Sequence, residues 1–325
     1  MAVIAMREAL NQALREELAR DENVFLMGED IAVFEGSYKV TLNLLKEFGE
    51  RRVIDTPIAE EGFVGVGIGA AMMGLRPVVE VMTINFMLVA MDQVVNHAAK
   101  ARYMFGGEVR VPLTIRTPGG GGQQLTAQHS QSLEVMFAHV PGLKVVAPAT
   151  PADAKGMLKS AIRDDNPVMF IENITLYNTR GEVPDGEYLV PLDKADIKRP
   201  GRDITLIGHS KGTLLALQAA EMLAAQGIDA EVLDLRSLRP LDTEAIVKSV
   251  QKTGRAVIVE EGWATFGISA EVSATIMEGA FDYLDAPVGR VGGKEVPMPY
   301  SKPLETAAIP TAQEVVQKVH DLLGE

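Results

Sequence analysis

Short apolar runs alternate with amphipathic stretches along the chain. Apolar runs of strand length occupy residues 23–28, 77–82, 111–116, 143–148 and 167–172. Continuous runs of this length are typical of strands buried on both faces of a parallel sheet. Helical patterns lie between them, at residues 86–100 and 151–163, and the first 24 residues read as an amphipathic helix. This alternation predicts an α/β domain with a parallel sheet.

The pattern is interrupted once. Residues 176–202 lose the periodicity and collect proline, glycine and charge, so we expect a linker between a first domain, 1–175, and a second domain, 203–325. The alternation then resumes, with strands expected at 204–208, 230–235 and 256–261 and helices expected at 213–225 and 311–323. The sequence therefore predicts two α/β domains.

Composition removes several classes of function. The 325 residues are 47% hydrophobic and 23% charged, and no apolar run is long enough to span a bilayer. The charged amphipathic N-terminal stretch does not resemble a secretory signal, so we expect a cytoplasmic protein. A formal net charge of −13 argues against binding to nucleic acid or anionic membranes. Without cysteine, the chain has no disulfide, thiolate metal site or cysteine nucleophile.

The motif GHSKG at residues 208–212 raises the hypothesis of a serine hydrolase. G-x-S-x-G between a strand and a helix is the nucleophile elbow of that class, with Ser210 as the nucleophile. The hypothesis also needs a later histidine, and His320 in an amphipathic helix is the sole candidate. The alternative is a tight strand-to-helix turn made by Gly208 and Gly212, with Ser210 as a helix cap.

The glycine-rich stretch IDTPIAEEGFVGVGIGAAMMG, residues 54–74, does not have the spacing of a dinucleotide fingerprint. Two acids, Glu60 and Glu61, precede its glycines and would repel a phosphate group. The acids suit the first turn of a helix, where the helix dipole favours carboxylates. Four glycines between Gly62 and Gly69 weaken that helix by about 1 kcal/mol each relative to alanine. Close packing against a neighbouring helix or subunit is the expected compensation.

A second glycine cluster, residues 119–122, follows the run at 111–116. Loops at the ends of parallel strands are where α/β folds bind ligands. His129 follows this cluster, and a histidine there can transfer protons near neutral pH. The alternative is a structural histidine bonded within its own loop.

Three long segments, residues 55–93, 127–148 and 154–172, taken together resemble the beta subunit of thiamine-diphosphate-dependent 2-oxo acid dehydrogenases. The pyruvate dehydrogenase form is the most similar, and the resemblance covers essentially the whole chain. It implies two three-layer α/β domains with mostly parallel sheets: a transketolase-like pyrimidine-binding domain and a transketolase C-terminal-like domain. The implied enzyme decarboxylates pyruvate and passes the acyl group to a lipoyl carrier, between glycolysis and acetyl-CoA synthesis.

The resemblance also implies roles for individual residues. Glu60 matches the acid that bonds the aminopyrimidine ring of thiamine diphosphate and favours its reactive tautomer. Phe86 matches a ring that stacks on the pyrimidine, and Met82 and Ile58 match neighbouring apolar contacts. By the same resemblance, His129 faces the reacting carbon and transfers protons as the acyl group leaves. Apart from the resemblance, Met82 and Phe86 are equally compatible with core packing.

A potassium site is a further implication of the resemblance. Hard oxygen ligands suit such a cation, and the matching residues are Leu113, Ala161, Ile162, Asp164 and Asn166. An ordinary helix C-terminal turn is the alternative.

One family motif is missing. The GDG motif that binds the diphosphate and its magnesium in thiamine enzymes does not occur in this sequence. The resemblance therefore implies half a site, completed by an alpha subunit with Mg²⁺ in an α2β2 heterotetramer beside a lipoyl-carrying acyltransferase core. Val89 stands where some relatives carry glutamine, which puts one contact to the cofactor in doubt. Branched-chain 2-oxo acid or acetoin dehydrogenase subunits are the alternatives for the substrate, and a non-catalytic subunit is a further one.

Overall fold

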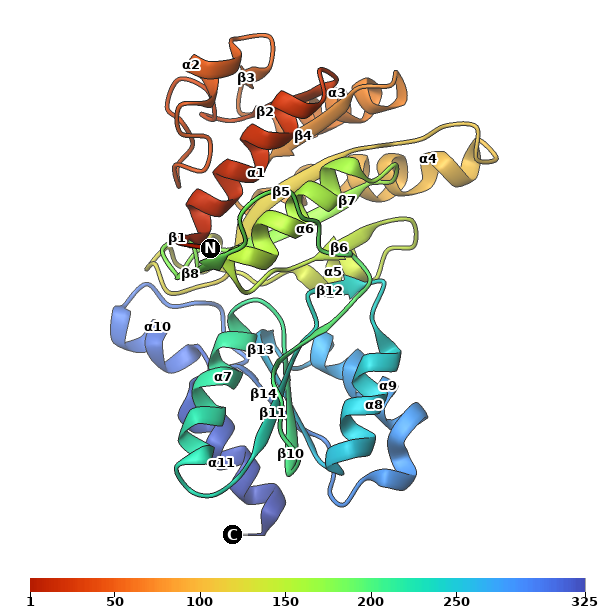
Figure 1. Cartoon of the computed structure of the whole chain (residues 1–325). Coiled ribbons are helices and arrows are strands. Elements are labelled where there is room, and N and C mark those ends of the chain that lie inside the picture. Colours follow the sequence, from red (N-terminus) through yellow and green to blue (C-terminus); the bar gives the residue numbers. More distant parts are fainter. Residues whose placement is uncertain (325) are drawn as a thin grey trace. The chain divides into compact units, whose positions relative to one another are not determined.

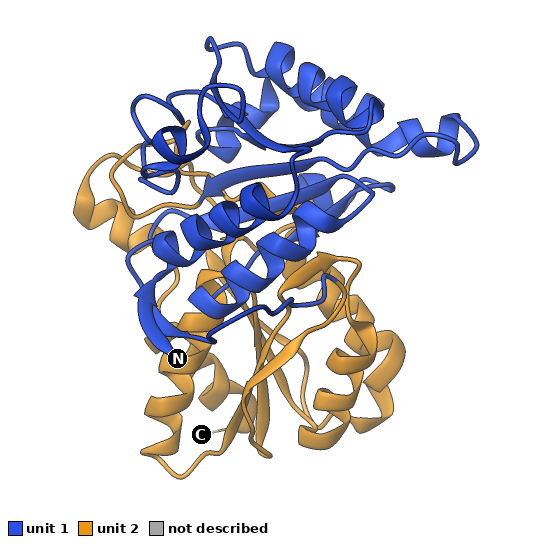
Figure 2. Cartoon of the chain, turned by 45° about the horizontal axis from the view of Figure 1, so that its top comes forward, with its two compact units in different colours: residues 1–119, 136–192 blue, residues 120–135, 193–325 orange. Residues whose placement is uncertain are grey.

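The computed structural model describes residues 1–324, which form two compact units (Figure 2). Residues 1–119 and 136–192 make up the first unit, and residues 120–135 and 193–325 make up the second. The segment 120–135, which contains the second glycine cluster and His129, therefore belongs to the second unit.

The first unit is built on a parallel sheet with strand order β6-β7-β5-β4-β2-β3. Its strands are β2 (Val24–Gly28), β3 (Val53–Asp55), β4 (Arg76–Glu80), β5 (Thr114–Gly119), β6 (Lys144–Val146) and β7 (Val168–Asn173). Its helices are α1 (Met6–Arg20), α2 (Leu44–Phe48), α3 (Glu60–Met72), α4 (Ala99–Met104) and α6 (Pro151–Arg163). A short helix, α5 (Glu134–Ala138), starts in the segment assigned to the second unit. Helices lie on both faces of the sheet (Figure 1), as the alternating pattern predicts.

The helix expected at residues 86–100 is divided into pieces. The 3₁₀ segment η1 (Ile84–Leu88) is followed by the π-helical segment η2 (Gln93–Ala98) and then by α4. Lys100 Nζ donates to the carbonyl oxygen of Val95 at 3.1 Å, and Asn96 Nδ2 donates to Asp92 Oδ1 at 2.6 Å. Side chains bonded within the segment compete with a regular helical ladder, and π-helical turns occur frequently at functional sites.

The second unit has a five-stranded sheet with order β14-β13-β10-β11-β9, in which β9 is antiparallel to its neighbour. The strands of this sheet are β9 (Asp196–Arg199), β10 (Ile204–Gly208), β11 (Ala230–Asp234), β13 (Ala256–Trp263) and β14 (Gly289–Gly293). The second unit also contains the short strand β12 (Ser237–Arg239), which is not one of these five. Its helices are α7 (Lys211–Ala224), α8 (Thr243–Thr253), α9 (Ile268–Ala280), η3 (Phe281–Tyr283), α10 (Lys302–Ala308) and α11 (Ala312–Leu323). Helices α7 and α11 cover one face of this sheet, and α8 and α9 cover the other (Figure 1).

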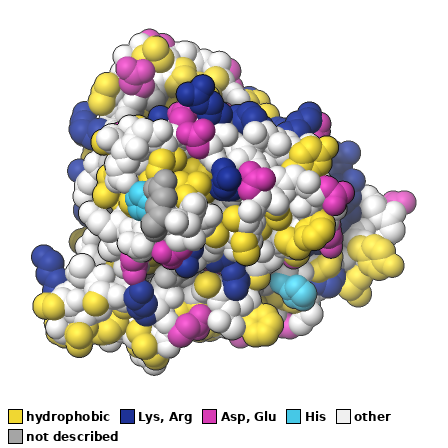
Figure 3. Space-filling model, turned by 90° about the horizontal axis from the view of Figure 1, so that it is seen from below, with side chains coloured by type: hydrophobic (Ala, Val, Ile, Leu, Met, Phe, Trp, Pro, Cys, Tyr) yellow, Lys and Arg dark blue, Asp and Glu magenta, His cyan; other side chains and the backbone are white. Residues whose placement is uncertain are grey.

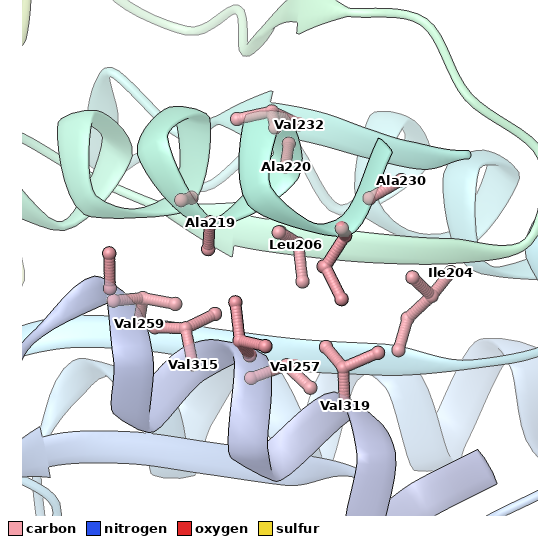
Figure 4. Close-up of a cluster of buried hydrophobic side chains, with 14 of the residues drawn as sticks. Ile204, Leu206, Ala219, Ala220, Ala230, Val232, Val257, Val259, Val315 and Val319 are labelled. Atoms are coloured by element: carbon pink, nitrogen blue, oxygen red, sulfur yellow. The ribbon is translucent and has the colours of Figure 1, made fainter. Parts of the chain in front are cut away.

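Valine, leucine and alanine fill the core between the sheet and α7 and α11. Val315 and Val319 of α11 point toward Val257 and Val259 of β13 (Figure 4). Each of these four side chains is fully buried. The helix begins where Thr311 and Glu314 form a reciprocal capping box, which satisfies N–H groups that a helix start otherwise leaves unbonded. The expected helix at residues 311–323 is thus confirmed.

The segment 176–202, expected to be a linker, contains two short strands. β8 (Arg180–Val183) pairs antiparallel with β1 (Ala2–Ala5), and β9 forms the edge of the second sheet. Neither strand has a strong apolar pattern, because each is a half-exposed edge element whose partner is far away in the sequence.

No helix among the described residues is long and apolar enough to cross a membrane. On the face drawn in Figure 3, hydrophobic, basic and acidic side chains are interspersed, and no single sign of charge covers it.

Candidate active site

The candidate site of the first unit lies at the carboxyl edge of its parallel sheet. Glu29 directly follows β2, Glu60 begins α3 after β3, and Met82 follows β4. Because parallel strands end at the same edge, these residues share the region where open α/β sheets bind their ligands. The sequence predicts Glu60 and Met82 as cofactor-binding residues at this edge, but no sequence motif pointed to Glu29.

Glu60 and Glu29 form a buried carboxylate pair. Their side chains are 6% and 5% exposed, whereas Glu61, the next residue in α3, is exposed. Burial, and then the negative charge of Glu60, raise the pKa of the Glu29 carboxyl to about 7. Glu29 Oε1 has no hydrogen-bond partner among the described residues. A buried, unpartnered oxygen beside a second carboxylate is suited to receive a donor from a ligand.

The apolar residues predicted for the site differ in exposure. Ile58 is 83% exposed, and Met82 and Phe86 are half-buried. Val89 is also exposed, whereas Ile84 and Met87 of the η1 segment are fully buried. Apolar side chains that remain accessible beside buried carboxylates can contact a flat ring from its face.

A buried charged cluster supports this edge of the sheet, and sequence analysis did not predict it. Arg116 donates from Nε and Nη2 to the two oxygens of Glu172, each at 2.6 Å, and from Nη1 to Glu80. The hydroxyl of Tyr177 donates to Glu172, and its ring stacks on Tyr38. Burial raises the pKa of Glu80 above its ordinary value, even though the Arg116 charge opposes this shift. Arg116 and Glu172 each end an apolar run of strand length, at residues 111–116 and 167–172. The local pattern therefore gives no signal that these two side chains pair across neighbouring strands.

His129 lies in the second unit, in the loop that follows the glycine cluster. The side chain of His129 is exposed. Its backbone N–H donates to the carbonyl oxygen of Thr126 at 3.3 Å. Gly120 N–H donates to the carbonyl oxygen of Gln131 at 3.1 Å and closes the loop. Of the residues predicted for cofactor and chemistry, Ile58, Glu60, Met82 and Phe86 lie in the first unit and His129 lies in the second.

The comparisons identify the family. A model of the transketolase pyrimidine-binding domain matches residues 2–179, and one of the transketolase C-terminal domain matches residues 193–315. The chain is 52% identical over 320 residues to the "Pyruvate dehydrogenase E1 component subunit beta" of Rhizobium meliloti, covering 98% of this chain and 70% of the relative. The chain belongs to this family of transketolase-like E1 beta subunits.

Two further similarities agree with that family. The chain is 52% identical over 317 residues to the "Pyruvate dehydrogenase E1 component subunit beta, mitochondrial" of Dictyostelium discoideum, covering 96% of this chain and 89% of the relative. The solved structure "Split gene transketolase, inactive beta4 tetramer" has a TM-score of 0.82 and 25% identity, and the match covers 99% of each chain. The predicted two-domain, mostly parallel α/β fold is thereby confirmed.

In this E1 beta chain, four of the residues expected around potassium lie in the last turn of α6 and just after it: Ala161, Ile162, Asp164 and Asn166. The fifth, Leu113, directly precedes β5, and its carbonyl oxygen accepts from the N–H of Val168 at 2.9 Å. Arg76 Nη1 donates to the carbonyl oxygens of Ile162 at 3.2 Å and of Asp164 at 3.1 Å. Lys144 pairs with the Asp164 carboxylate. Two cationic side chains, Arg76 and Lys144, therefore already bond the oxygens of Ile162 and Asp164.

The motif GHSKG forms the tight turn that was the alternative to a hydrolase elbow. A Cβ on Gly208 would lie 2.6 Å from the nitrogen of Thr213, and one on Gly212 would lie 2.3 Å from the carbonyl oxygen of Val259. Ser210 is the N-cap residue of α7, with φ 48° and ψ −126°, but its hydroxyl makes no capping hydrogen bond. His320, which a hydrolase would need, contacts Gln226 at 2.7 Å. The serine hydrolase hypothesis is not favoured in this family.

Proposed function

We propose that this chain is the beta subunit of a heterotetrameric pyruvate dehydrogenase first component, which acts on thiamine diphosphate and passes an acyl group to a lipoyl carrier. Two relatives at 52% identity have names that state the pyruvate dehydrogenase E1 component. The proposal assigns the chain half of an active site and assigns the other half to an alpha subunit.

The pair of Glu60 and Glu29 is the single observation that carries this proposal. Glu60 sits at the start of α3, where the helix dipole stabilises its negative charge. Glu29, with its pKa raised to about 7, can hold a proton beside it. Together they place two carboxyl groups side by side, an arrangement that can hold a proton and bond a ring nitrogen.

The residues present fit the pyrimidine end of thiamine diphosphate. When bound, the cofactor supplies a thiazolium carbanion that acts as an electron sink for decarboxylation. In our proposal, Glu60 bonds the pyrimidine ring, the half-buried Phe86 stacks on it, and Met82 and Ile58 make apolar contacts.

The diphosphate end requires a partner in this proposal. Within residues 1–324 there is no group of three or more His, Cys, Asp or Glu side chains that could hold a metal ion. Exposed apolar side chains surround the glycine face of α3: Ile58 (83%), Val66 (61%) and Met73 (84%). Apolar surface of this kind is characteristic of a subunit interface. We therefore assign the Mg²⁺ and diphosphate ligands to an alpha subunit in an α2β2 assembly, beside a lipoyl acyltransferase core.

His129 has the second chemical role in this proposal. Its imidazole is exposed on a loop of the second unit, and imidazole is the side chain that most often transfers protons in catalysis. We assign it proton transfer as the acyl group leaves for the lipoyl arm. The compartment we propose is the cytoplasm, on the sequence alone, since the names of the relatives include one marked mitochondrial and one not.

Potassium is proposed at the turn after α6, on carbonyl oxygens that already accept from Arg76. A monovalent cation that binds there would stabilise the folded chain, by an amount that rises with the logarithm of its concentration. Thermal unfolding in potassium chloride against sodium chloride at equal ionic strength tests this proposal. An equal midpoint in the two salts would contradict it.

The turnover of the reconstituted complex tests the proposed substrate. The chain is combined with its alpha subunit and assayed with pyruvate, a branched-chain 2-oxo acid and acetoin. Pyruvate should have the highest kcat/KM, by about tenfold or more over the branched-chain acid, because a site that selects the methyl group of pyruvate discriminates against a larger side chain. Higher kcat/KM with acetoin or the branched-chain acid would favour those alternatives instead.

A further inference from the structure

The glycine loop, defined here as residues 120–131, is closed at its base and strained in its middle. Its first and last residues are joined by the hydrogen bond from Gly120 to Gln131, as in a compact Ω-loop. Gln124 and Thr126 have φ of 56° and 63°, a left-handed conformation that side chains other than glycine rarely adopt. Such backbone persists only where its surroundings fix it.

Two buried carboxylates of the same unit fix the glycine loop. Glu305 of α10 accepts through Oε1 from the N–H of Gly122 at 2.9 Å and from the N–H of Gln124 at 3.0 Å. Glu261 of β13 accepts from the N–H of Gly121 at 2.9 Å. Glu305 is 2% exposed and Glu261 is 9% exposed. Three successive parts of the loop are therefore bonded to acids from two separate elements.

The hydrogen bonds between Glu305 and the glycine loop stabilise both partners. In the part of the chain that the structure describes, its carboxylate accepts from the backbone of the loop and pairs with no side-chain cation. Glu261, by contrast, also accepts from Lys211 Nζ at 3.1 Å. A buried carboxylate is costly unless hydrogen bonds compensate for lost water. The bonds to Gly122 and Gln124 are that compensation for Glu305.

The segment that carries Glu305 also packs directly on the loop. A Cβ on Gly121 would lie 2.8 Å from Met298 Cε and 3.4 Å from Ile309 Cδ1. A side chain at position 121 would displace the flexible end of Met298. The N–H of Lys294 donates to the carbonyl oxygen of Ala308 at 2.9 Å and holds this segment against the end of β14.

We infer that Glu305, assisted by Glu261, is a positioning residue for the reaction, because it sets the conformation of the glycine loop and thereby the location of His129. The backbone of His129 is bonded to Thr126 within the same loop, so a change in the loop displaces its imidazole. Displacement of a reacting group by about 1 Å can lower a rate on the order of a hundredfold. This inference rests on the proposed role of His129 in acyl transfer.

Hydrogen exchange of the loop amides in the full-length chain tests the anchoring. Glu305→Ala removes every acceptor oxygen, Glu305→Gln retains one, and Glu314→Gln is a matched control because Glu314 caps α11 without bonding the loop. Exchange at Gly122 and Gln124 should accelerate by about tenfold or more in Glu305→Ala, reflecting loss of charge-assisted bonds. It should accelerate less in Glu305→Gln and not at all in the control.

Kinetics of the reconstituted complex test the link to His129. In Glu305→Ala, kcat for acyl transfer to a lipoyl domain should fall about tenfold to a hundredfold, while decarboxylation measured with ferricyanide should change far less. The same split is expected for His129→Ala. Unchanged loop exchange in both Glu305 variants would overturn the anchoring, and acyl transfer at the rate of Glu314→Gln would overturn the positioning role. A wild-type complex inactive toward pyruvate would instead refute the proposed function, with the exchange rates still deciding the anchoring.

Discussion

Glu60 and Glu61 carry the same side chain in adjacent positions but have opposite environments. Successive helical residues point about 100° apart, so Glu60 is buried beside Glu29 while Glu61 faces solvent. A charged group acts strongly on a bound ring only where water is excluded. The buried acid is therefore the one we assign to the pyrimidine ring.

Replacement of the two acids should separate their roles. In the reconstituted complex, Glu60→Gln should slow exchange of the thiazolium proton by about ten- to a hundredfold, since a charge-assisted hydrogen bond contributes roughly 1.5–3 kcal/mol. Glu61→Gln should have a far smaller effect. Exchange followed by NMR measures both. The assignment would be wrong if Glu61→Gln proved the more damaging change.

Glu29 should make the stability of the chain depend on pH. Its pKa is raised from an ordinary 4.5 to about 7, so the folded chain keeps a proton that the unfolded chain loses between these values. The free energy of unfolding should therefore fall as pH rises from 4.5 to 7, by on the order of 2 kcal/mol from this group.

Chemical denaturation at pH 5 and pH 8 checks this sign. Glu29→Gln should gain stability relative to wild type as pH rises, whereas Glu22→Gln, a change at an exposed acid, should not. Burial also raises the pKa of Glu134 to about 7. Because Glu134 is present in all three proteins, its contribution cancels when the free energies of unfolding of two proteins are subtracted. A wild-type minus Glu29→Gln difference that stays constant with pH would refute the assignment.

At the scale of elements, the glycines of α3 serve two different faces of the helix. A Cβ on Gly67 would lie 2.6 Å from Val79 Cγ2 of β4, so this glycine permits close packing on the sheet. Gly69 has nothing within 4 Å of such a Cβ and is exposed. Packing among the described residues therefore does not require a glycine at position 69.

Alanine substitution should distinguish the two faces. Gly67→Ala should lower the free energy of unfolding by about 1–3 kcal/mol through overpacking. Gly69→Ala should raise it by up to about 1 kcal/mol through helix propensity, yet weaken assembly with the alpha subunit. Denaturant unfolding and analytical ultracentrifugation measure the two effects. Unimpaired assembly of Gly69→Ala would argue against an interface at this face.

At the scale of the whole molecule, we propose that the chain contributes the groups for one end of the cofactor. The carboxylate pair and apolar residues suit a pyrimidine ring, and residues 1–324 contain no acidic or histidine cluster suited to a metal. Binding of a diphosphate requires cationic or metal ligands. We therefore expect the affinity to arise on assembly.

Calorimetry of the chain alone and of the complex tests this expectation. The isolated chain should bind thiamine diphosphate weakly or not at all, with or without Mg²⁺, because we assign the diphosphate ligands to the partner. The complex should bind tightly only with Mg²⁺. Tight, magnesium-dependent binding by the isolated chain would mean that the half-site is wrongly assigned.

The sequence by itself determined the features that depend on neighbouring residues. Periodicity predicted the α/β alternation, and the helices expected at 151–163 and 311–323 are α6 and α11. The acids at the start of α3 followed from the preference of carboxylates for a helix N-terminus. Long motifs identified the family, because a shared fold and chemistry preserve residue order along the whole chain.

Only the tertiary structure decided which distant residues meet. Glu29 lies beside Glu60 because β2 and β3 are adjacent strands whose ends share one edge of the sheet. Glu305 reaches Gly122 across a separation of 183 residues, and β1 pairs with β8 across the first unit. Local propensity carries no information about such contacts, since they form only when burial of the whole core brings the elements together. The pKa of Glu29 and the bonding of the glycine loop follow from that assembly.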